Sequence, residues 1–219
     1  MNQEQIASNI LRSGLSDQRV INLLDNLKLK SFNARFMCDT LLSLVPSVPV
    51  LQFFILRLAD INFTNIYGET ALFNFANRDI ELFRFALEIG ADLNIRSSGG
   101  ETILSHLIKT GNIEAFKLLI ERDDLDLNEC GREVSPLVTA VLYNRFEMVD
   151  ILVRKGADTN NVEQLVSKSI EIFNRNGYKT PRKPKSVSRF CAMAEFLSEC
   201  IKETRNERLA KIIRSELSR

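Results

Sequence analysis

The sequence predicts an all-α solenoid of stacked helical hairpins. Two observations support this fold class: similar segments recur at a period of about 33 residues, and apolar residues within each segment recur at helical spacing. One helical hairpin cannot bury such apolar faces alone, whereas stacked hairpins bury them against one another.

The repetition is clearest in three segments, residues 67–94, 99–128 and 132–160. Thr70, Thr102 and Ser135 occupy equivalent places in them, 32 and 33 residues apart. A hydroxyl at such a place can accept hydrogen bonds from the free N–H groups that begin a helix. The pattern therefore predicts that a first helix starts after each of these residues.

Each segment carries two apolar faces. The first-helix faces are Leu72, Phe75 and Ala76, then Leu104, Leu107 and Ile108, then Leu137, Ala140 and Val141. The second-helix faces are Ile80, Phe83 and Leu87, then Ile113, Phe116, Leu119 and Ile120, then Phe146, Val149, Leu152 and Val153. Gly90 and Gly156 are placed to end second helices in the left-handed conformation.

This pattern resembles the ankyrin repeat, in which a G-x-T-P-L-H turn leads into a first helix, a glycine turn into a second, and G-A-D-x-N closes the unit. The resemblance covers residues 67–160. Departures occur: the motif proline is present only as Pro136, Asn144 replaces the glycine that Gly111 retains, and one residue is missing near 78–79.

The segment LADIN at 58–62 resembles another G-A-D-x-N ending, and it suggests an organisation for the rest of the chain. We expect an N-terminal helical cap at 1–30, ankyrin repeats over 31–160 (31–64 degenerate, 65–96, 97–129, 130–160), and at 161–219 a degenerate fifth repeat with a basic loop and a C-terminal capping helix. Within the first cap, helices are expected at 3–12 and 17–29, and a second helix of the degenerate repeat at 49–58.

Charge is unevenly distributed although the formal net charge is only +1. Residues 1–158 have a net charge of −5 and residues 159–219 a net charge of +6. A uniformly basic nucleic-acid binder is excluded, but a local basic patch is not. The candidate patch comprises Lys179, Arg182, Lys183, Lys185 and Arg189. It is either a solvated loop or a contact for nucleic acid or an acidic membrane surface.

Catalytic and metal-binding patterns are absent from the sequence. His106 is the only histidine, so a catalytic triad or dyad would have to use it; the simpler reading is a surface polar residue. The four cysteines form no C-x-x-C pair, which predicts reduced thiols and no zinc site. No phosphate-binding loop occurs. We expect no catalytic residue, no metal and no cofactor.

The expected localisation depends on two features that the sequence lacks, a membrane span and a secretory signal. No apolar run approaches the roughly 18 residues of a membrane span, and the first residues lack the pattern of a secretory signal. We expect a monomeric cytoplasmic protein without a small-molecule substrate. The divergent repeats and the Phe-, Asn-, Ile- and Leu-rich composition suit a microbial effector, which would act in the host cytoplasm.

The resemblance implies a partner protein, bound by the finger tips and by the concave side of the first helices. The implied tip residues are Asn65, Tyr67, Glu69, Arg96, Ser98, Glu101, Arg132 and Glu133. The implied first-helix residues are Asn74, Arg78, His106, Lys109, Thr139, Leu142 and Tyr143. Helix faces that point away from the stacking core form one extended surface. Within it Tyr67, Leu142 and Tyr143 are the best candidates for residues that dominate the binding energy. The alternative for these three is packing against a neighbouring repeat.

Overall fold

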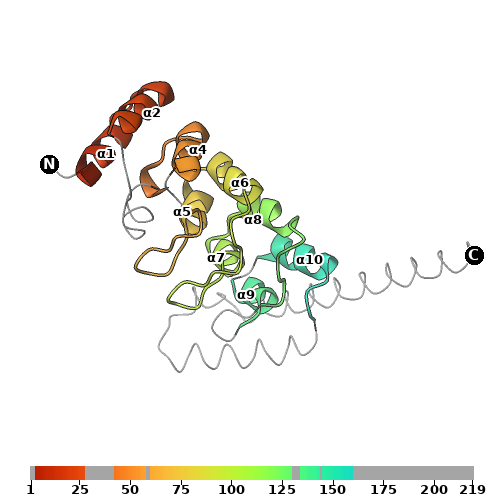
Figure 1. Ribbon diagram of the computed structural model, residues 1–219. Coiled ribbons are helices and arrows are strands. Elements are labelled where there is room, and N and C mark those ends of the chain that lie inside the picture. Colours follow the sequence, from red (N-terminus) through yellow and green to blue (C-terminus); the bar gives the residue numbers. More distant parts are fainter. Residues whose placement is uncertain (1–2, 28–41, 58–59, 130–133, 144, 160–219) are drawn as a thin grey trace, which may run out of the picture. The chain divides into compact units, whose positions relative to one another are not determined.

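The computed structural model describes residues 3–27, 42–57, 60–129, 134–143 and 145–159. Figure 1 shows its helices: α1 (Gln3–Leu11), α2 (Asp17–Asn26), α4 (Val48–Arg57), α5 (Ala71–Arg78), α6 (Ile80–Glu88), α7 (Ile103–Thr110), α8 (Ile113–Ile120), α9 (Pro136–Leu142) and α10 (Phe146–Lys155). An isolated antiparallel β-bridge joins Thr64 and Thr70. The predicted all-α class is confirmed.

The chain divides into two compact units. One comprises residues 1–107 and 114–125, and the other 108–113 and 126–219, so the boundary passes through α7 and α8. The predicted fifth repeat, basic loop and C-terminal cap lie outside the described residues. We also expect a first helix of the degenerate repeat at 33–45, and most of it lies outside them too. The boundaries of the predicted repeats stay predictions.

Hydroxyl caps begin two of the three predicted first helices. Ser105 N donates to Thr102 Oγ1 over 3.2 Å, and Val138 N donates to Ser135 Oγ over 3.3 Å. Thr70 also precedes its helix in extended backbone, but its side chain makes no capping bond. The expected hydroxyl cap is therefore wrong at Thr70, where the carbonyl accepts instead, from Phe73 N at 3.1 Å.

A single residue joins α5 to α6, where the sequence is one residue short. Asp79 ends α5 and begins α6, and its carboxylate accepts from Glu81 N at 2.9 Å and Leu82 N at 3.2 Å. Two donors at the start of α6 are thereby satisfied without a glycine turn. The predicted left-handed glycines at the ends of second helices are confirmed: Gly90 has φ of 83° and Gly156 has φ of 98°.

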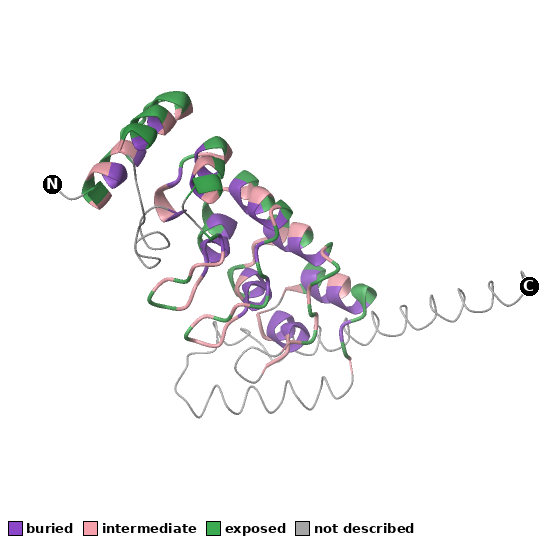
Figure 2. Cartoon of the chain, viewed as in Figure 1, coloured by how far each residue is buried: buried purple, intermediate pink, exposed green. Residues whose placement is uncertain are grey.

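The predicted first-helix faces are all buried, and most of the second-helix faces are too (Figure 2). The clear exception is Phe146, which is 40% exposed. It is the first residue of α10, and the buried face of that helix consists of Met148, Val149, Leu152 and Val153. The predicted inward position of Phe146 is therefore wrong, because its place at the helix start carries it beyond the face that packs.

The D-x-N sequence that closes each repeat forms a local turn. The carboxylate of Asp60 accepts from Asn62 N at 2.9 Å, and that of Asp92 accepts from Asn94 N at 2.8 Å. In the second unit, the carboxylate of Asp126 accepts from Asn128 N at 2.8 Å. Each aspartate thus replaces a backbone acceptor and fixes the chain as it leaves the second helix.

The asparagine of D-x-N joins one repeat to the next. In the first unit Asp92 N donates to Asn62 Oδ1 over 2.8 Å, and in the second Asp158 N donates to Asn128 Oδ1 over 2.7 Å. Both bonds connect residues 30 positions apart. The periodic asparagine therefore contributes to stacking, in addition to the apolar faces.

Asn62→Ala should lower the free energy of unfolding by about 1 kcal/mol, because it removes the acceptor of the Asp92 N–H. Asn22→Ala is the matched control, since Asn22 is exposed in the interior of α2, where its Oδ1 accepts a hydrogen bond from Gln18 Nε2 over 3.0 Å. Its replacement should raise helix propensity slightly. Urea titration followed by far-UV circular dichroism measures both, and equal effects would contradict the proposed inter-repeat bond.

Candidate functional site

The loop before α5 forms a tight turn over residues 65–69, here called the first tip. Asn65 organises it: its Oδ1 accepts from Tyr67 N at 2.8 Å and Glu69 N at 2.9 Å, and its Nδ2 donates to Glu69 Oε2 over 3.1 Å. The backbone closes the turn through Asn65 N, which donates to Glu69 O over 2.9 Å. Asn65, predicted to contact a partner, thus acts within the tip.

The loop before α7 repeats this geometry over residues 97–101, here called the second tip. Ser97 N donates to Glu101 O over 2.9 Å, and Glu101 N donates to Ser97 Oγ over 3.1 Å. Ser98 N donates to Tyr67 O over 2.6 Å, which ties the two tips together. Gly68 has φ of 71°, and a Cβ there would lie 2.7 Å from Ser98 N, so the contact between tips requires glycine.

The first tip presents two apolar side chains to solvent. Tyr67 is 62% exposed and its neighbour Ile66 is 48% exposed. The alternative that Tyr67 packs against a neighbouring repeat is thereby excluded, since most of its side chain is accessible. The sequence reasoning missed Ile66, which lies inside the same tip. Arg96 and Ser98 are also exposed, whereas Arg132 and Glu133 lie outside the described residues.

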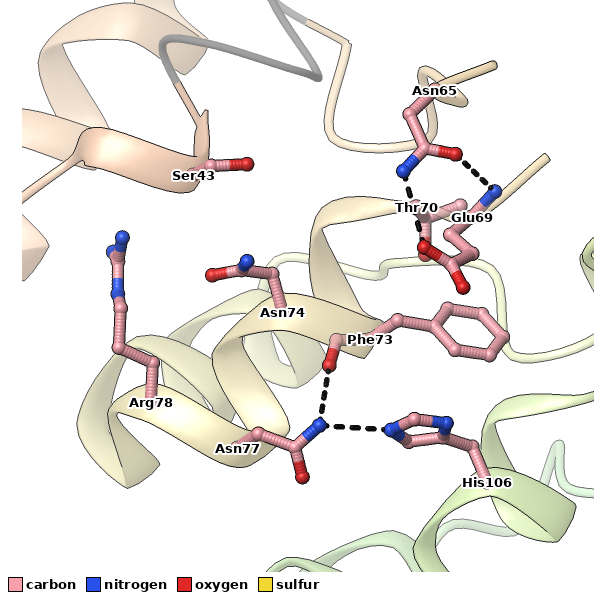
Figure 3. A pocket seen from close by; sticks show the side chains of 9 residues that line it. All are labelled: Ser43, Asn65, Glu69, Thr70, Phe73, Asn74, Asn77, Arg78 and His106. Atoms are coloured by element: carbon pink, nitrogen blue, oxygen red, sulfur yellow. Dashed lines mark hydrogen bonds between the residues drawn. The ribbon is translucent and has the colours of Figure 1, made fainter. Parts of the chain in front are cut away.

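A hollow of about 470 Å³, here called the α5 hollow, opens beside α5 (Figure 3). Its lining is Ser43, Asn65, Glu69, Thr70, Phe73, Asn74, Asn77, Arg78 and His106. Five of these were predicted partner contacts, and the structure brings them together from the first tip, α5 and α7. Ser43, Thr70, Phe73 and Asn77 were missed. Helical spacing from Asn74 could have found Asn77, three residues on.

His106 is held in place at one end of the hollow. The Nδ2 atom of Asn77 lies 3.3 Å from Phe73 O, to which it donates, and 2.9 Å from His106 Nε2. An amide nitrogen that donates to both makes Nε2 an acceptor, so a neutral ring carries its proton on Nδ1. That nitrogen lies 3.8 Å from Glu101 Oε2, and Phe73 meets the ring edge-to-face at 5.3 Å. These contacts position the ring as part of a wall.

Arg78 lies at the opposite end and reaches a neighbouring segment. Its Nη2 donates to Val45 O, and its guanidinium lies 5.7 Å from the centre of the Phe75 ring. Burial lowers the pKa of Arg78, and the charge of Asp79 opposes that shift. An arginine remains protonated regardless. The structure thus assigns Arg78 a packing role that sequence reasoning did not foresee, while one side of it still faces the hollow.

The predicted surface residues of the second unit differ in exposure. Lys109 is exposed, and Leu142 and Tyr143 are half-buried. Thr139 is only 4% exposed, and its hydroxyl donates to Ser135 O over 3.0 Å. Thr139 is therefore corrected from a surface contact to a buried residue, because it lies on the packed side of α9.

Residues 44–129 and 75–163 match a family model described as ankyrin repeats, three copies. The two matches overlap and together cover more than half of the chain. The chain belongs to the ankyrin-repeat family. Ankyrin repeats are protein–protein interaction modules, and this membership accounts for the stacked hairpins and for the loops that form the two tips.

Three relatives show the same resemblance over part of their length. An ankyrin repeat protein of Rickettsia felis is 35% identical over 44% of this chain and 33% of its own. The ankyrin repeat and SAM domain-containing protein 6 of Danio rerio is 29% identical over 52% of this chain and 16% of its own. The B-cell lymphoma 3 protein homolog of Mus musculus is 37% identical over 39% of this chain and 19% of its own. The chain thus spans a third or less of these relatives.

Two other kinds of feature are absent from the described residues. No group of three His, Cys, Asp or Glu side chains there is placed to hold a metal ion. No helix in the same ranges is long and apolar enough to cross a membrane. Arg122 donates two hydrogen bonds, of 3.0 and 3.2 Å, to the carboxylate of Asp124, and that pairing lowers the pKa of Asp124.

Proposed function

We propose that this ankyrin-repeat chain binds a partner protein, as an adaptor or inhibitor without catalysis of its own. The binding surface in the first unit comprises the two tips and the α5 hollow. The observation that carries the proposal is the exposed side chain of Tyr67 on a backbone fixed by hydrogen bonds at both of its peptide groups.

Tyr67 has the properties of a binding anchor. Its N–H is held by Asn65 and its carbonyl by Ser98, so the position of the side chain is set before a partner arrives. Preorganisation of this kind limits the ordering cost of association. Tyrosine also combines a large apolar ring with a polar hydroxyl, and such residues often dominate the energy of protein interfaces. Ile66 beside it adds apolar area at the same tip.

The setting in which this binding occurs is inferred from the sequence and a relative. The divergence of the repeats and the resemblance to a Rickettsia felis ankyrin repeat protein favour a microbial effector that binds a host protein in the host cytoplasm. We expect it to act as a monomer. In this proposal His106 forms part of the wall of the α5 hollow, because its Nε2 contacts Asn77 Nδ2.

An affinity pull-down from a eukaryotic cell lysate at about 150 mM salt tests the proposal. Tyr67→Ala, alone and combined with Tyr143→Ala, should reduce capture of a partner. Loss of the Tyr67 anchor should weaken affinity by about thirtyfold, or about 2 kcal/mol. Phe146→Ala is the matched control, since it removes an exposed aromatic ring from α10 and should leave capture unchanged.

The alternative function assigns binding to the basic residues near 179–189, which lie outside the described residues. The observation in its favour is a run of cations without an acidic residue among them. If this alternative holds, capture survives the tyrosine changes. It is then lost at high salt, or when Arg182, Lys183 and Lys185 are neutralised, because contacts with an acidic surface are screened by salt.

A further inference from the structure

We propose that the α5 hollow is a subsite for one acidic side chain of the partner, bound by Arg78 and Asn74. This inference rests on the proposed function, since it names the chemistry that part of the protein-binding surface recognises. It is carried by an arginine that forms no ion pair within the described residues, set beside an exposed amide in a defined hollow.

Arg78 can donate more hydrogen bonds than it makes within the described residues. A guanidinium carries five N–H donors, and Arg78 donates to Val45 O while its plane lies near the Phe75 ring. In the described part of the chain, no carboxylate forms a salt bridge with it. The nearest acidic residue in sequence, Asp79, is engaged in capping α6. A partly desolvated cation in this state is stabilised by an incoming carboxylate.

Asn74 supplies a second donor on the same side of α5. It precedes Arg78 by four residues, which places both side chains on one helix face. Figure 3 shows the two rising from that face beside Ser43. Asn74 is exposed, so its amide is available to a ligand. A guanidinium and an amide together match the acceptor geometry of a carboxylate, with charge-assisted bonds from the arginine.

The surroundings favour one carboxylate over a polyanion. Glu69 lines the same hollow, where Asn65 holds it, and residues 1–158 carry a net charge of −5. A nucleic acid would place several phosphates in this unfavourable field. A single Asp or Glu side chain needs only the local pair of donors, and the polar walls give no advantage to an apolar group.

The test uses linear peptides of about twelve residues displayed on phage and selected on the full chain. Selected peptides should share an Asp or Glu at one position. In a synthetic peptide, replacing that Asp or Glu by Asn or Gln should weaken its binding to the wild-type chain by about tenfold or more. Asn74→Asp places a carboxylate beside Arg78. The acid-to-amide change in the peptide should therefore have little effect on its affinity for this variant. Asn22→Asp on α2 carries the identical charge change away from the hollow, and should behave as wild type.

Two results would overturn the acidic subsite: selected peptides with no shared acid, or an equal loss from the amide replacement on wild type and Asn74→Asp. Thermal unfolding of both variants verifies that they are folded. If the peptides lose affinity with Tyr67→Ala but show no acid preference, the subsite is wrong and the protein-binding function stands. Failure to select any peptide also overturns the subsite, while the Tyr67 pull-down tests the function independently.

Discussion

Phe83→Ala should lower the free energy of unfolding by about 3–5 kcal/mol, whereas Phe146→Ala should lower it by less than about 1 kcal/mol. The sequence places both phenylalanines on the inward faces of second helices. Phe83 is fully buried in α6, so its removal leaves a cavity in a packed core. Phe146 is 40% exposed at the start of α10 and leaves little unfilled space.

Urea titration followed by far-UV circular dichroism measures this difference. The two substitutions delete the same atoms, so each serves as the control for the other. Phe83→Leu provides a milder change at the buried site and should cost about 1 kcal/mol, which guards against complete unfolding of the alanine variant. Comparable losses for Phe83→Ala and Phe146→Ala would contradict the packing described for α10.

Gly111→Ala should destabilise the second unit by about 2–3 kcal/mol through two effects. Gly111 has φ of 77°, which a residue with a Cβ adopts at a cost. The added Cβ would also overlap the guanidinium of Arg145. Arg145 Nε donates to Ile108 O over 3.0 Å and its Nη2 to Lys109 O over 2.8 Å, so displacing it frees the last carbonyls of α7.

A double-mutant cycle separates these effects. Arg145→Ala alone should cost about 2 kcal/mol, because two charge-assisted bonds to carbonyls are lost. Combined with Gly111→Ala, the total should be smaller than the sum of the single changes by about 1 kcal/mol or more, since the alanine has already displaced the arginine. Additive losses from chemical denaturation would show that Arg145 and Gly111 act separately.

Arginines perform a related task in each unit. Arg78 donates to Val45 O in the first unit, and Arg145 donates to Ile108 O and Lys109 O in the second. In both cases a side chain at the turn between two helices binds carbonyls more than 30 residues earlier in the chain. A helix end exposes carbonyls that its own backbone cannot satisfy, and a guanidinium fork can bind them.

Much of the fold was predictable because its determinants are local. The apolar spacing predicted the buried faces of α5, α7 and α9, and the caps at Thr102 and Ser135 follow from hydroxyls before a helix. Predictions failed where one position has two possible roles. Phe146 fits helical spacing yet lies at the helix start, and Thr139 was assigned to the surface although its α9 neighbours are packed.

The binding surface was only partly predictable. Five predicted residues do line the α5 hollow, because repeat positions and helix faces follow from spacing. No pattern in the sequence indicates the contacts that join one repeat to another. The sequence predicts Asn65 and Arg78 as partner contacts. In the structure Asn65 orders its own tip, and Arg78 also donates to Val45 O.

The amino-acid sequence by itself determined the repeat, the helical class and the family, because period and helical spacing are properties of neighbouring residues along one chain. Only the tertiary structure decided that Asn62 binds Asp92, that Ser98 fixes Tyr67, and that Arg78 and Asn74 share a hollow. These contacts depend on how successive hairpins stack. Stacking places a side chain beside backbone groups some 30 residues away in sequence, and no local pattern records that distance.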